Sequence, residues 1–476
     1  MVDTFQNTGT TILITLPSII AAGHALLHKH DSRSALLWII ISFTLPLVGP
    51  FFYWCLGVNR ISRRARIWKE SGRRMRGPEL HPVVVEEKVA LPETASHLKD
   101  LRVLGDHIVK VPLRAGNKLC SLINGEYAYS AMLAAIKRAE KNINICSYIF
   151  DGNGIGAEFA RELAASADRG VEVRIIIDAL GEKYSSISIS KALAGSKVHL
   201  KRYLPLKNGA YINLRNHRKL MVIDGNEAFS GGINIRDNHM PSRFAGSNAI
   251  HDLHFHVKGP VVSDLQRSFQ EDWFFVSGIK LESEDLFPLL AQEGTSVVRC
   301  ISDGPDREFR KLNQIILGAL SCAKRSVCIM TPYFVPDRTL IAALITTALR
   351  GVPVVIVLPG KNNLPFVHWA GRAILDELLA NDVQVFYQPP PFVHTKLFLI
   401  DGVWSLIGST NLDSRSLRLN FELNLSVFCE NFGKEMQILF ENARQQSMEV
   451  KREELNKRSL PVKLLDNFAR LFSPYL

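Results

Sequence analysis

One pattern of residues occurs twice in this chain. The first copy reads NHRKLMVIDGNEAFSGGINI from Asn216 to Ile235, and the second reads VHTKLFLIDGVWSLIGSTNL from Val393 to Leu412. Both copies contain His-x-Lys, four apolar residues, Asp-Gly, five further residues, a pair of small residues and, one residue on, an Asn. The second copy follows the first by 177 positions. A repeat in such strict register predicts two similar structural units within one chain.

The matched positions are His217, Lys219, Asp224, Gly232 and Asn234 in the first copy and His394, Lys396, Asp401, Ser409 and Asn411 in the second. The runs LMVID and LFLID are short, apolar and ended by Asp-Gly, which predicts buried strands closed by tight turns. Side chains alternate along a strand, so His217 and Lys219 are expected on one face and Arg218 on the other. Asp224 and Asp401 end the strands beside glycine, which indicates that they hold the turns and do not carry protons.

This set of residue types suits phosphoryl transfer. Fixed Lys and Asn donors stabilise the charge on the non-bridging oxygens of a phosphodiester. One imidazole can attack phosphorus to give a covalent intermediate, while the other protonates the leaving oxygen. A single His-x-Lys pair is more often an ordinary strand histidine beside a solvated lysine. The repeat argues against that alternative and predicts one complete site built from two half-sites, without metal or nucleotide.

At these residues the sequence resembles the phospholipase D superfamily, whose signature is His-x-Lys-x4-Asp followed by Gly-Gly or Gly-Ser and Asn. The runs RNHRKLMVIDG and GSTNLDSRSLRLNFELNL (Gly408–Leu425) resemble the bacterial cardiolipin synthases, and the resemblance extends over nearly the whole chain. It implies an α/β fold of two similar phospholipase D-like α/β/α sandwich domains. These domains would pack about a pseudo-two-fold axis with the site between them.

The resemblance also implies roles for individual residues. The implied catalytic residues are His217, Lys219, Asp224, His394, Lys396 and Asp401, and the implied phosphate-binding residues are Asn234, Asn411 and Ser409. Asp252 and Glu422 each lie a few dozen residues after a motif, and they are the implied carboxylate partners of the two histidines. A carboxylate on the second ring nitrogen fixes the tautomer and stabilises the imidazolium. A surface ion pair is the alternative, for Asp252 especially.

The implied reaction joins two phosphatidylglycerol molecules into cardiolipin and releases glycerol through a phosphatidyl-histidine. The superfamily's habit makes His217 the nucleophile, although near-symmetric motifs leave the order open. Other acceptors would give other enzymes: water a phospholipase D-type hydrolase, serine a phosphatidylserine synthase, and DNA a nuclease. A catalytically inactive lipid-binding scaffold is the alternative from another class.

Composition limits the partners of the chain. It has 476 residues, is 47% hydrophobic and carries a net charge of +11, which suggests an anionic partner.

The seven cysteines of the chain form no C-x-x-C pair, which fits a reducing compartment and argues against a disulfide framework or a zinc site. A G-x-G-x-x-A pattern at 152–157 is explained as a strand-to-helix turn, and no Walker-type loop is present. No cofactor or metal is therefore expected.

The N-terminal region predicts membrane attachment. Residues 11–27 and 34–57 are uncharged runs of about membrane-spanning length, so residues 1–60 are expected to form a transmembrane hairpin. A cleaved signal peptide is the alternative for the first run, but that run lacks a preceding positive charge and a second run follows. Eight basic residues follow between Arg60 and Arg76. They predict a cytoplasmic catalytic part at the bacterial inner membrane, and they would attract anionic lipids. Phosphatidylglycerol and anionic membrane lipids, not nucleic acid, are thus the expected partners.

The rest of the chain is expected to alternate strands and helices. Residues 61–105 are predicted to form a basic juxtamembrane segment and linker. Residues 106–285 and 286–476 are predicted to form the two domains, because GVEVRIIIDA at 170–179 parallels GVPVVIVLPG at 351–360. Helices are expected near 128–141, 156–169, 261–275, 312–323, 339–351 and 366–382.

Overall fold

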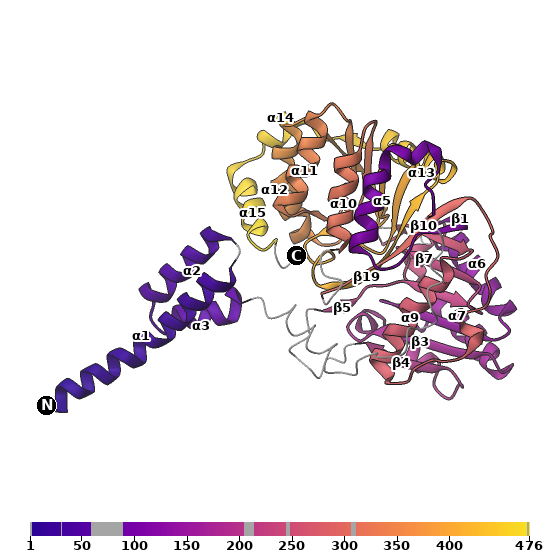
Figure 1. Cartoon of the computed structure of the whole chain (residues 1–476), viewed down its shortest axis with the longest axis horizontal. Coiled ribbons are helices and arrows are strands. Elements are labelled where there is room, and N and C mark those ends of the chain that lie inside the picture. Colours follow the sequence, from indigo (N-terminus) through magenta and orange to yellow (C-terminus); the bar gives the residue numbers. More distant parts are fainter. Residues whose placement is uncertain are drawn as a thin grey trace. The chain divides into compact units, whose positions relative to one another are not determined.

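The computed structural model of the chain describes residues 2–29, 31–58, 89–203, 214–243, 248–305, 311–473 and 476 (Figure 1). The chain divides into two compact units, Met1–Arg64 and Ala65–Leu476. The basic cluster from Arg60 to Arg76 and the first part of the predicted linker lie outside the described residues.

The first unit is helical. It consists of α1 (Val2–His28), α2 (Ser32–Thr44), the short α3 (Val48–Phe52) and a π-helical turn, η1 (Tyr53–Gly57). The second apolar run is therefore not one continuous helix. Pro46 disfavours helical geometry at Leu45, and α2 ends there. Among the described residues, none of the helices combines the length and the apolar character needed to cross a bilayer.

Side-chain hydrogen bonds join the helical segments of this unit. The Ser18 hydroxyl donates to the carbonyl oxygen of Ser42 at 2.5 Å, so a buried polar group of α1 is satisfied by α2. His24 Nδ1 lies 2.8 Å from the Tyr53 hydroxyl. The two predicted runs thus pack against each other as a pair.

The second unit is built on one long, twisted sheet whose two ends mirror each other. Outward from its centre, the first half contributes β1 (Arg114–Ile123), β9 (Leu253–Lys258), β7 (Glu227–Gly231), β6 (Leu220–Ile223), β2 (Asn142–Ser147), β3 (Glu172–Asp178) and β4 (His199–Tyr203). The second half contributes β10 (Ser296–Asp303), β19 (Asn420–Phe428), β17 (Trp404–Gly408), β16 (Leu397–Ile400), β11 (Val327–Met330), β13 (Val354–Pro359), β14 (Val383–Gln388) and the added edge strand β20 (Met448–Glu449). β1 and β10 pair antiparallel at the centre. Every strand of this path in the first half thus has a counterpart at the same place in the second half, as the repeat predicted.

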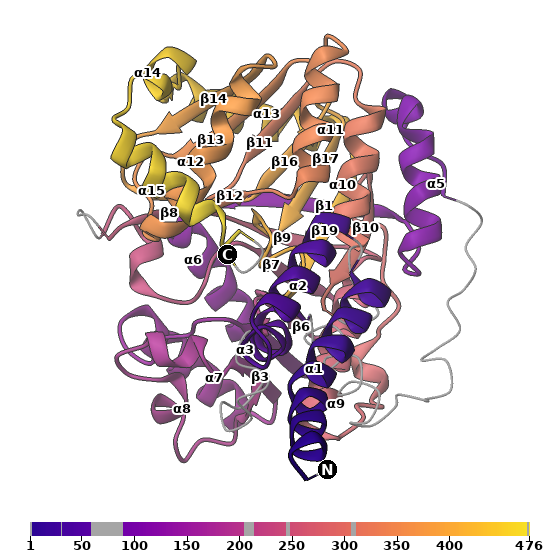
Figure 2. The ribbon, with the colours of Figure 1, turned by 90° about the vertical axis from the view of Figure 1, so that its left-hand side faces the viewer.

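Helices cover both faces of each half. In the first half these are α6 (Asn124–Arg138) and α7 (Ile155–Asp168) on one face and α9 (Val262–Ser277) on the other. In the second half they are α10 (Lys311–Cys322), α11 (Arg338–Leu349) and α12 (Pro365–Leu379) on one face and α13 (Glu430–Gln445) on the other (Figures 1 and 2). The expected α/β/α sandwiches and the six expected helices are present.

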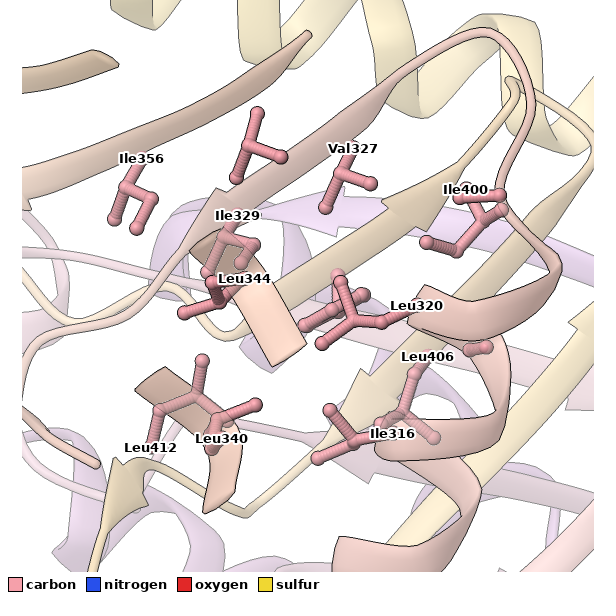
Figure 3. Close-up of a cluster of buried hydrophobic side chains, with 14 of the residues drawn as sticks. Ile316, Leu320, Val327, Ile329, Leu340, Leu344, Ile356, Ile400, Leu406 and Leu412 are labelled. Carbon is pink, nitrogen blue, oxygen red and sulfur yellow. The ribbon is translucent and has the colours of Figure 1, made fainter. Parts of the chain in front are cut away.

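Apolar side chains of the inner strands pack against the helices in a hydrophobic core. In the second half, Val327 and Ile329 of β11 pack with Ile316 of α10 and Leu344 of α11 (Figure 3). These side chains are almost completely buried. β2 with β3, and β11 with β13, pair in parallel, and their Val- and Ile-rich sequences fit strands buried on both faces.

The end of the predicted linker is part of the second half. Residues 93–98 form a 3-10 helix, η2 (Glu93–Leu98), and α5 (Lys99–Ile108) continues it and packs on α10 (Figure 2). Leu98 and Leu101 belong to the same core as α10 and β11. The chain then crosses to the first half through β1. The predicted domain boundary near residue 285 stays a prediction.

The remaining short elements are η3 (Gly181–Tyr184), α8 (Ile189–Ala192), β5 (Arg215–Asn216), η5 (Asp237–His239), β8 (Ile250–His251), η6 (Glu284–Leu286), β12 (Phe334–Val335), β15 (Phe392–Val393), β18 (Leu412–Asp413), α14 (Arg452–Asn456) and α15 (Leu460–Arg470). Two of them, β5 and β15, bring the halves together at the motifs.

Candidate active site

Two short parallel ladders join the halves at the two motifs. β5, directly before His217, pairs with the start of β19 in the second half. β15, directly before His394, pairs with β8 in the first half. The His217 backbone N–H donates to the carbonyl oxygen of Phe421 at 2.9 Å, and the His394 N–H donates to that of His251 at 2.7 Å. Each motif histidine is therefore placed on a strand of the opposite half.

The ladders create two crossed pairs of histidine and carboxylate. His217 Nδ1 lies 3.0 and 3.1 Å from the two carboxylate oxygens of Glu422. His394 Nδ1 lies 2.7 Å from Asp252 Oδ2. Both carboxylates are completely buried, whereas the imidazoles keep about a tenth of their surface exposed. The predicted carboxylates thus reach the predicted histidines, and a surface ion pair is excluded for both.

The two lysines repeat one arrangement. Lys219 Nζ donates to the carbonyl oxygen of His217 at 2.7 Å, and Lys396 Nζ donates to that of His394 at 2.5 Å. Lys396 Nζ also lies 3.1 Å from His394 Nε2. Burial lowers the pKa of Lys219 to about 7 and that of Lys396 to about 8. A bound phosphate anion would favour the charged form of both lysines.

Burial and the lysines keep the imidazoles neutral. Burial lowers the pKa of His217, while the neighbouring Glu422 carboxylate opposes the shift. The pKa of His394 is held well below its usual range by burial and by the charges of Lys396 and Lys219. Burial would raise the pKa of Glu422, yet His217 and Lys219 hold it below its usual value. A neutral imidazole that donates Nδ1–H to a carboxylate presents a lone pair on Nε2, which is the form of a nucleophile or a base.

Ser409 orients a carboxylate, and its expected phosphate-binding role stays a prediction. Its hydroxyl donates to Glu422 and accepts the Leu423 N–H at 3.0 Å. Asn420 Nδ2 donates to the other oxygen of Glu422 at 3.0 Å. At the matching place in the first half, a Cβ on Gly232 would lie 2.2 Å from Asp252 Oδ1. The small pair of each motif therefore makes room for, or holds, the carboxylate that orients a histidine.

The two motif asparagines are fixed by neighbours. Asn234 Oδ1 accepts the Ile149 N–H at 3.3 Å, and Asn411 Nδ2 donates to the Ser416 hydroxyl at 3.2 Å. Asn411 Oδ1 is buried without a hydrogen-bond partner. The oxygen and nitrogen of this amide are assigned from its neighbours, and exchanging them would let Asn411 accept from Ser416 and present an N–H donor. Phosphate binding by both asparagines stays a prediction.

Asp224 and Asp401 hold turns, as their position in the sequence indicated. Both have positive φ, 50° and 56°, and each is followed by a glycine that also has positive φ. Asp224 accepts the backbone N–H groups of residues 140, 141 and 142 at 2.8–3.0 Å. Asp401 accepts those of residues 324, 325 and 326 at 2.7–3.0 Å. Each carboxylate thereby ties the end of its motif strand to the start of the neighbouring antiparallel strand, β2 or β11.

Sequence reasoning missed three aromatic neighbours of the histidines. The Tyr148 ring lies 5.1 Å from the His217 ring, and Tyr333 lies 6.4 Å from His394. Both tyrosines follow the first parallel strand of a half, at the carboxyl edge where α/β sheets bind ligands, and that rule could have found them. His239 is buried, with its ring 6.1 Å from His394 and its Nδ1 4.0 Å from Asp252 Oδ2. No sequence signal pointed to His239.

Arg218 acts on the opposite face of the motif, as the alternation predicted. It donates to Asp272 at 2.5 Å, to the Ser302 hydroxyl at 2.5 Å and to the carbonyl oxygen of Glu422 at 3.3 Å. This buried side chain fixes the backbone that carries the carboxylate of Glu422.

Within the ranges that the structure describes, no cluster of three or more His, Cys, Asp or Glu side chains is arranged to hold a metal ion.

The sequence of this chain matches known protein families and known proteins. Residues 132–273 and 316–444 match the family described as cardiolipin synthase, phospholipase D-like domain, and residues 16–57 match the phospholipase D-nuclease N-terminal family. The cardiolipin synthase of Geobacillus kaustophilus (strain HTA426) is 31% identical, over 98% of this chain and 93% of its own. Cardiolipin synthase 2 of Bacillus cereus is 29% identical, over 94% of this chain and 88% of its own.

Among solved structures, the phosphatidylserine synthase of Haemophilus influenzae Rd KW20 aligns with a TM-score of 0.59 at 16% identity. The alignment covers 79% of this chain and 100% of that one, which shows a shared fold. Together with the paired motifs and the mirrored sheet, the family match shows that this chain belongs to the bacterial cardiolipin synthases of the phospholipase D superfamily.

Proposed function

We propose that this chain transfers a phosphatidyl group between two phosphatidylglycerol molecules, giving cardiolipin and glycerol. The observation that carries the proposal is the pair of crossed contacts, His217 with Glu422 and His394 with Asp252. Two oriented imidazoles beside two buried ammonium groups are what a two-step exchange at phosphorus requires. One phosphodiester replaces another, so the reaction needs no nucleotide.

In the first step, Nε2 of His217 attacks phosphorus of the first lipid. The bond between phosphorus and the glycerol oxygen breaks, and His394 gives that oxygen its proton. The phosphate anion in the site raises the pKa of His394, which burial and the lysines otherwise lower, and this allows His394 to carry the proton. Glycerol leaves, and the phosphatidyl group is bound to His217.

In the second step, the terminal hydroxyl of a second phosphatidylglycerol gives its proton to His394. Its oxygen attacks phosphorus, the bond to His217 breaks, and cardiolipin is released. Lys219, Lys396 and the amides of Asn234 and Asn411 hold the phosphoryl oxygens through both steps. The order of the two histidines follows the habit of the superfamily.

The first unit is proposed to anchor the enzyme as a hairpin at the bacterial inner membrane. Its described helices expose large apolar side chains at half or more of their surface: Leu16, Ile19, Ile20, Leu26, Leu27, Leu36, Leu37, Ile40 and Phe43. Lipid would cover such a surface. The following basic cluster would keep residues 106–285 and 286–476, the proposed catalytic domains, on the cytoplasmic side beside anionic lipid.

The test uses membranes from cells that express the chain, supplied with radiolabelled phosphatidylglycerol. Cardiolipin, glycerol and phosphatidic acid are measured for the wild type, His217→Ala and His394→Ala. We expect equimolar cardiolipin and glycerol from the wild type and loss of both products in each variant. Phosphatidic acid with little cardiolipin would make the chain a hydrolase. No turnover of lipid would reject the proposal in favour of a nuclease or a scaffold.

A further inference from the structure

Helix α15 has the reverse of the usual distribution of side chains. Its inward side carries Asp466, which is almost completely buried and accepts two hydrogen bonds from Arg372 of α12 at 2.9 and 2.5 Å. Arg458 binds the same carboxylate. The outward side carries leucines and phenylalanines. A surface helix of a globular protein normally buries its apolar stripe and exposes its charges.

The exposed apolar side chains form one continuous surface, here called the α15 patch. Its members are Leu364, Leu460, Leu464, Leu465, Phe468, Leu471 and Phe472. Leu464 is 61% exposed, Phe468 54% and Leu471 72%. At helical spacing these three and Leu460 point the same way. The Phe472 ring lies 5.6 Å from Phe366 of α12, so the patch continues onto the start of α12 beside Leu364.

Contacts connect the α15 patch to the active site at two places. The Tyr333 hydroxyl, whose ring faces His394, donates to Asn363 Oδ1 at 2.8 Å, and Asn363 directly precedes Leu364 of the patch. The carbonyl oxygen of Leu476 accepts the Arg415 N–H at 2.7 Å, and Arg415 lies four residues after Asn411. α15 lies along α12 with the C-terminus near its end (Figures 1 and 2). The α15 patch is therefore next to the second motif.

The charges around the α15 patch are basic. Between Lys457 and Leu476 the sequence has four basic residues and one acidic residue, and that acidic residue is the buried Asp466. Lys361 and Lys457 are exposed and each lies three positions before a patch residue, Leu364 or Leu460, while Lys463 of α15 is half-buried. An apolar stripe of Leu and Phe with lysines at its margin is the pattern of a helix that lies in the interface of an anionic bilayer.

We propose that the α15 patch docks on the surface of an anionic lipid bilayer and holds the second motif at the head groups. The inference rests on the proposed function, because a lipid substrate has to enter the site from a bilayer. Leucine and phenylalanine side chains would enter the acyl boundary, while the lysines meet phosphate groups. The site would then receive phosphatidylglycerol without full extraction of the lipid into water.

The test compares the full-length wild type with Leu464→Ser/Phe468→Ser and with Ile438→Ser. Ile438 is 63% exposed on α13 and is a matched control outside the patch. Each protein is reconstituted into vesicles of phosphatidylcholine alone or with phosphatidylglycerol. Deuterium exchange of the amides at 459–473 is then measured. We expect exchange in the wild type and the control to be about tenfold slower with phosphatidylglycerol, and the double variant to lose this slowing.

A second readout separates docking from a structural role of α15. The double variant should form cardiolipin about tenfold more slowly from bilayer phosphatidylglycerol but at the wild-type rate from a monomeric short-chain analogue. Equal loss on both substrates would overturn the proposal. Exchange that is the same in both vesicle types would also overturn it, because another part of the chain would then cover the patch. If phosphatidylglycerol slows amide exchange at 459–473 but the protein forms no cardiolipin, the result would support docking and reject the proposed reaction.

Discussion

His217 and Glu422 lie 205 positions apart, yet the imidazole Nδ1 is 3.0 Å from an oxygen of the completely buried carboxylate. The same relation joins His394 to Asp252 in the opposite direction along the chain. Each half thus supplies one histidine and orients the histidine of the other half. Neither motif histidine is oriented by a carboxylate of its own half in the part of the chain that the structure describes.

Replacing Glu422 by glutamine should slow the reaction and shift the acid limb of its pH–rate profile. Without the carboxylate, the neutral tautomer and the imidazolium of His217 both lose their partner, so kcat should fall by about a hundredfold or more. The carboxylate raises the pKa of His217 against the effect of burial, so its removal lowers that pKa further. The acid limb of kcat/KM, which reports deprotonation of His217, should move to lower pH.

The exposed Glu453→Gln serves as the control and should leave the profile unchanged. An acid limb that moves to higher pH in Glu422→Gln would contradict the assigned contact.

Ser409 and Gly232 occupy the same position in the two motifs, and exchanging serine and glycine there should have unequal effects on activity. Ser409→Gly should reduce kcat by about tenfold or less, because Glu422 keeps its bonds to His217 and Asn420. Gly232→Ser should nearly abolish activity, because its Cβ would lie 2.2 Å from Asp252 Oδ1 and displace the partner of His394. Steady-state kinetics of the two purified variants, each checked for an unchanged melting temperature, measure the difference. Equal effects would show that the small pair does not position the carboxylates.

The sequence predicted the architecture well because the repeat imposes it. Matched strands such as β6 and β16 take matched places in the sheet, and their Asp-Gly ends form the expected tight turns, with positive φ. Residues whose role is local, such as Asp224 and Asp401, could be understood from their neighbours in the chain alone.

The crossing could not be predicted from spacing. Asp252 follows the first motif and Glu422 the second, and which histidine each reaches depends on the β5–β19 and β15–β8 pairings. Those pairings join backbone across the halves, and periodicity carries no information on them. The contact between the Ser409 hydroxyl and Glu422 could not be predicted from the sequence either, because it depends on how the strands pair.

Local sequence explains two details of the N-terminal part. Residues 34–57 are uncharged, but Pro46 ends α2 within them, so composition alone does not give the length of a helix. Residues 77–105 contain prolines and charges, and Leu98 and Leu101 near the end of this segment pack in the core of the second half.

Asp401→Asn should affect stability more than chemistry. Its carboxylate accepts three backbone N–H groups, so replacement should lower the free energy of unfolding by about 2 kcal/mol at neutral pH. Burial would raise the pKa of Asp401, but these donors hold it below the usual value. The stabilisation is therefore fully present above about pH 4 and is lost as pH falls through the lowered pKa.

Melting temperatures of the solubilised protein at pH 7, 5 and 3 test this. The gap between wild type and Asp401→Asn should be smaller at pH 3 than at pH 7. A gap that widens toward pH 3 would contradict the contact.

The buried lysines should give the enzyme an alkaline limit. The pKa of Lys219 is about 7 and that of Lys396 about 8, and only the charged forms attract the phosphate of phosphatidylglycerol. As pH rises through these values the free enzyme loses charge, so kcat/KM should decline between pH 7 and 9. Lys219→Met should reduce kcat/KM at every pH and remove the lower of the two transitions. A flat profile up to pH 10 would show that the lysines stay charged.

The most direct test of the composite site uses phosphatidyl-p-nitrophenol, whose leaving group needs no proton. His394→Ala should release a burst of about one p-nitrophenol per enzyme and retain the labelled lipid on His217, because only the general acid and base is missing. His217→Ala should show neither burst nor bound lipid. A burst in His217→Ala with none in His394→Ala would exchange the two roles. Bursts in both variants would contradict a single site shared by the two halves.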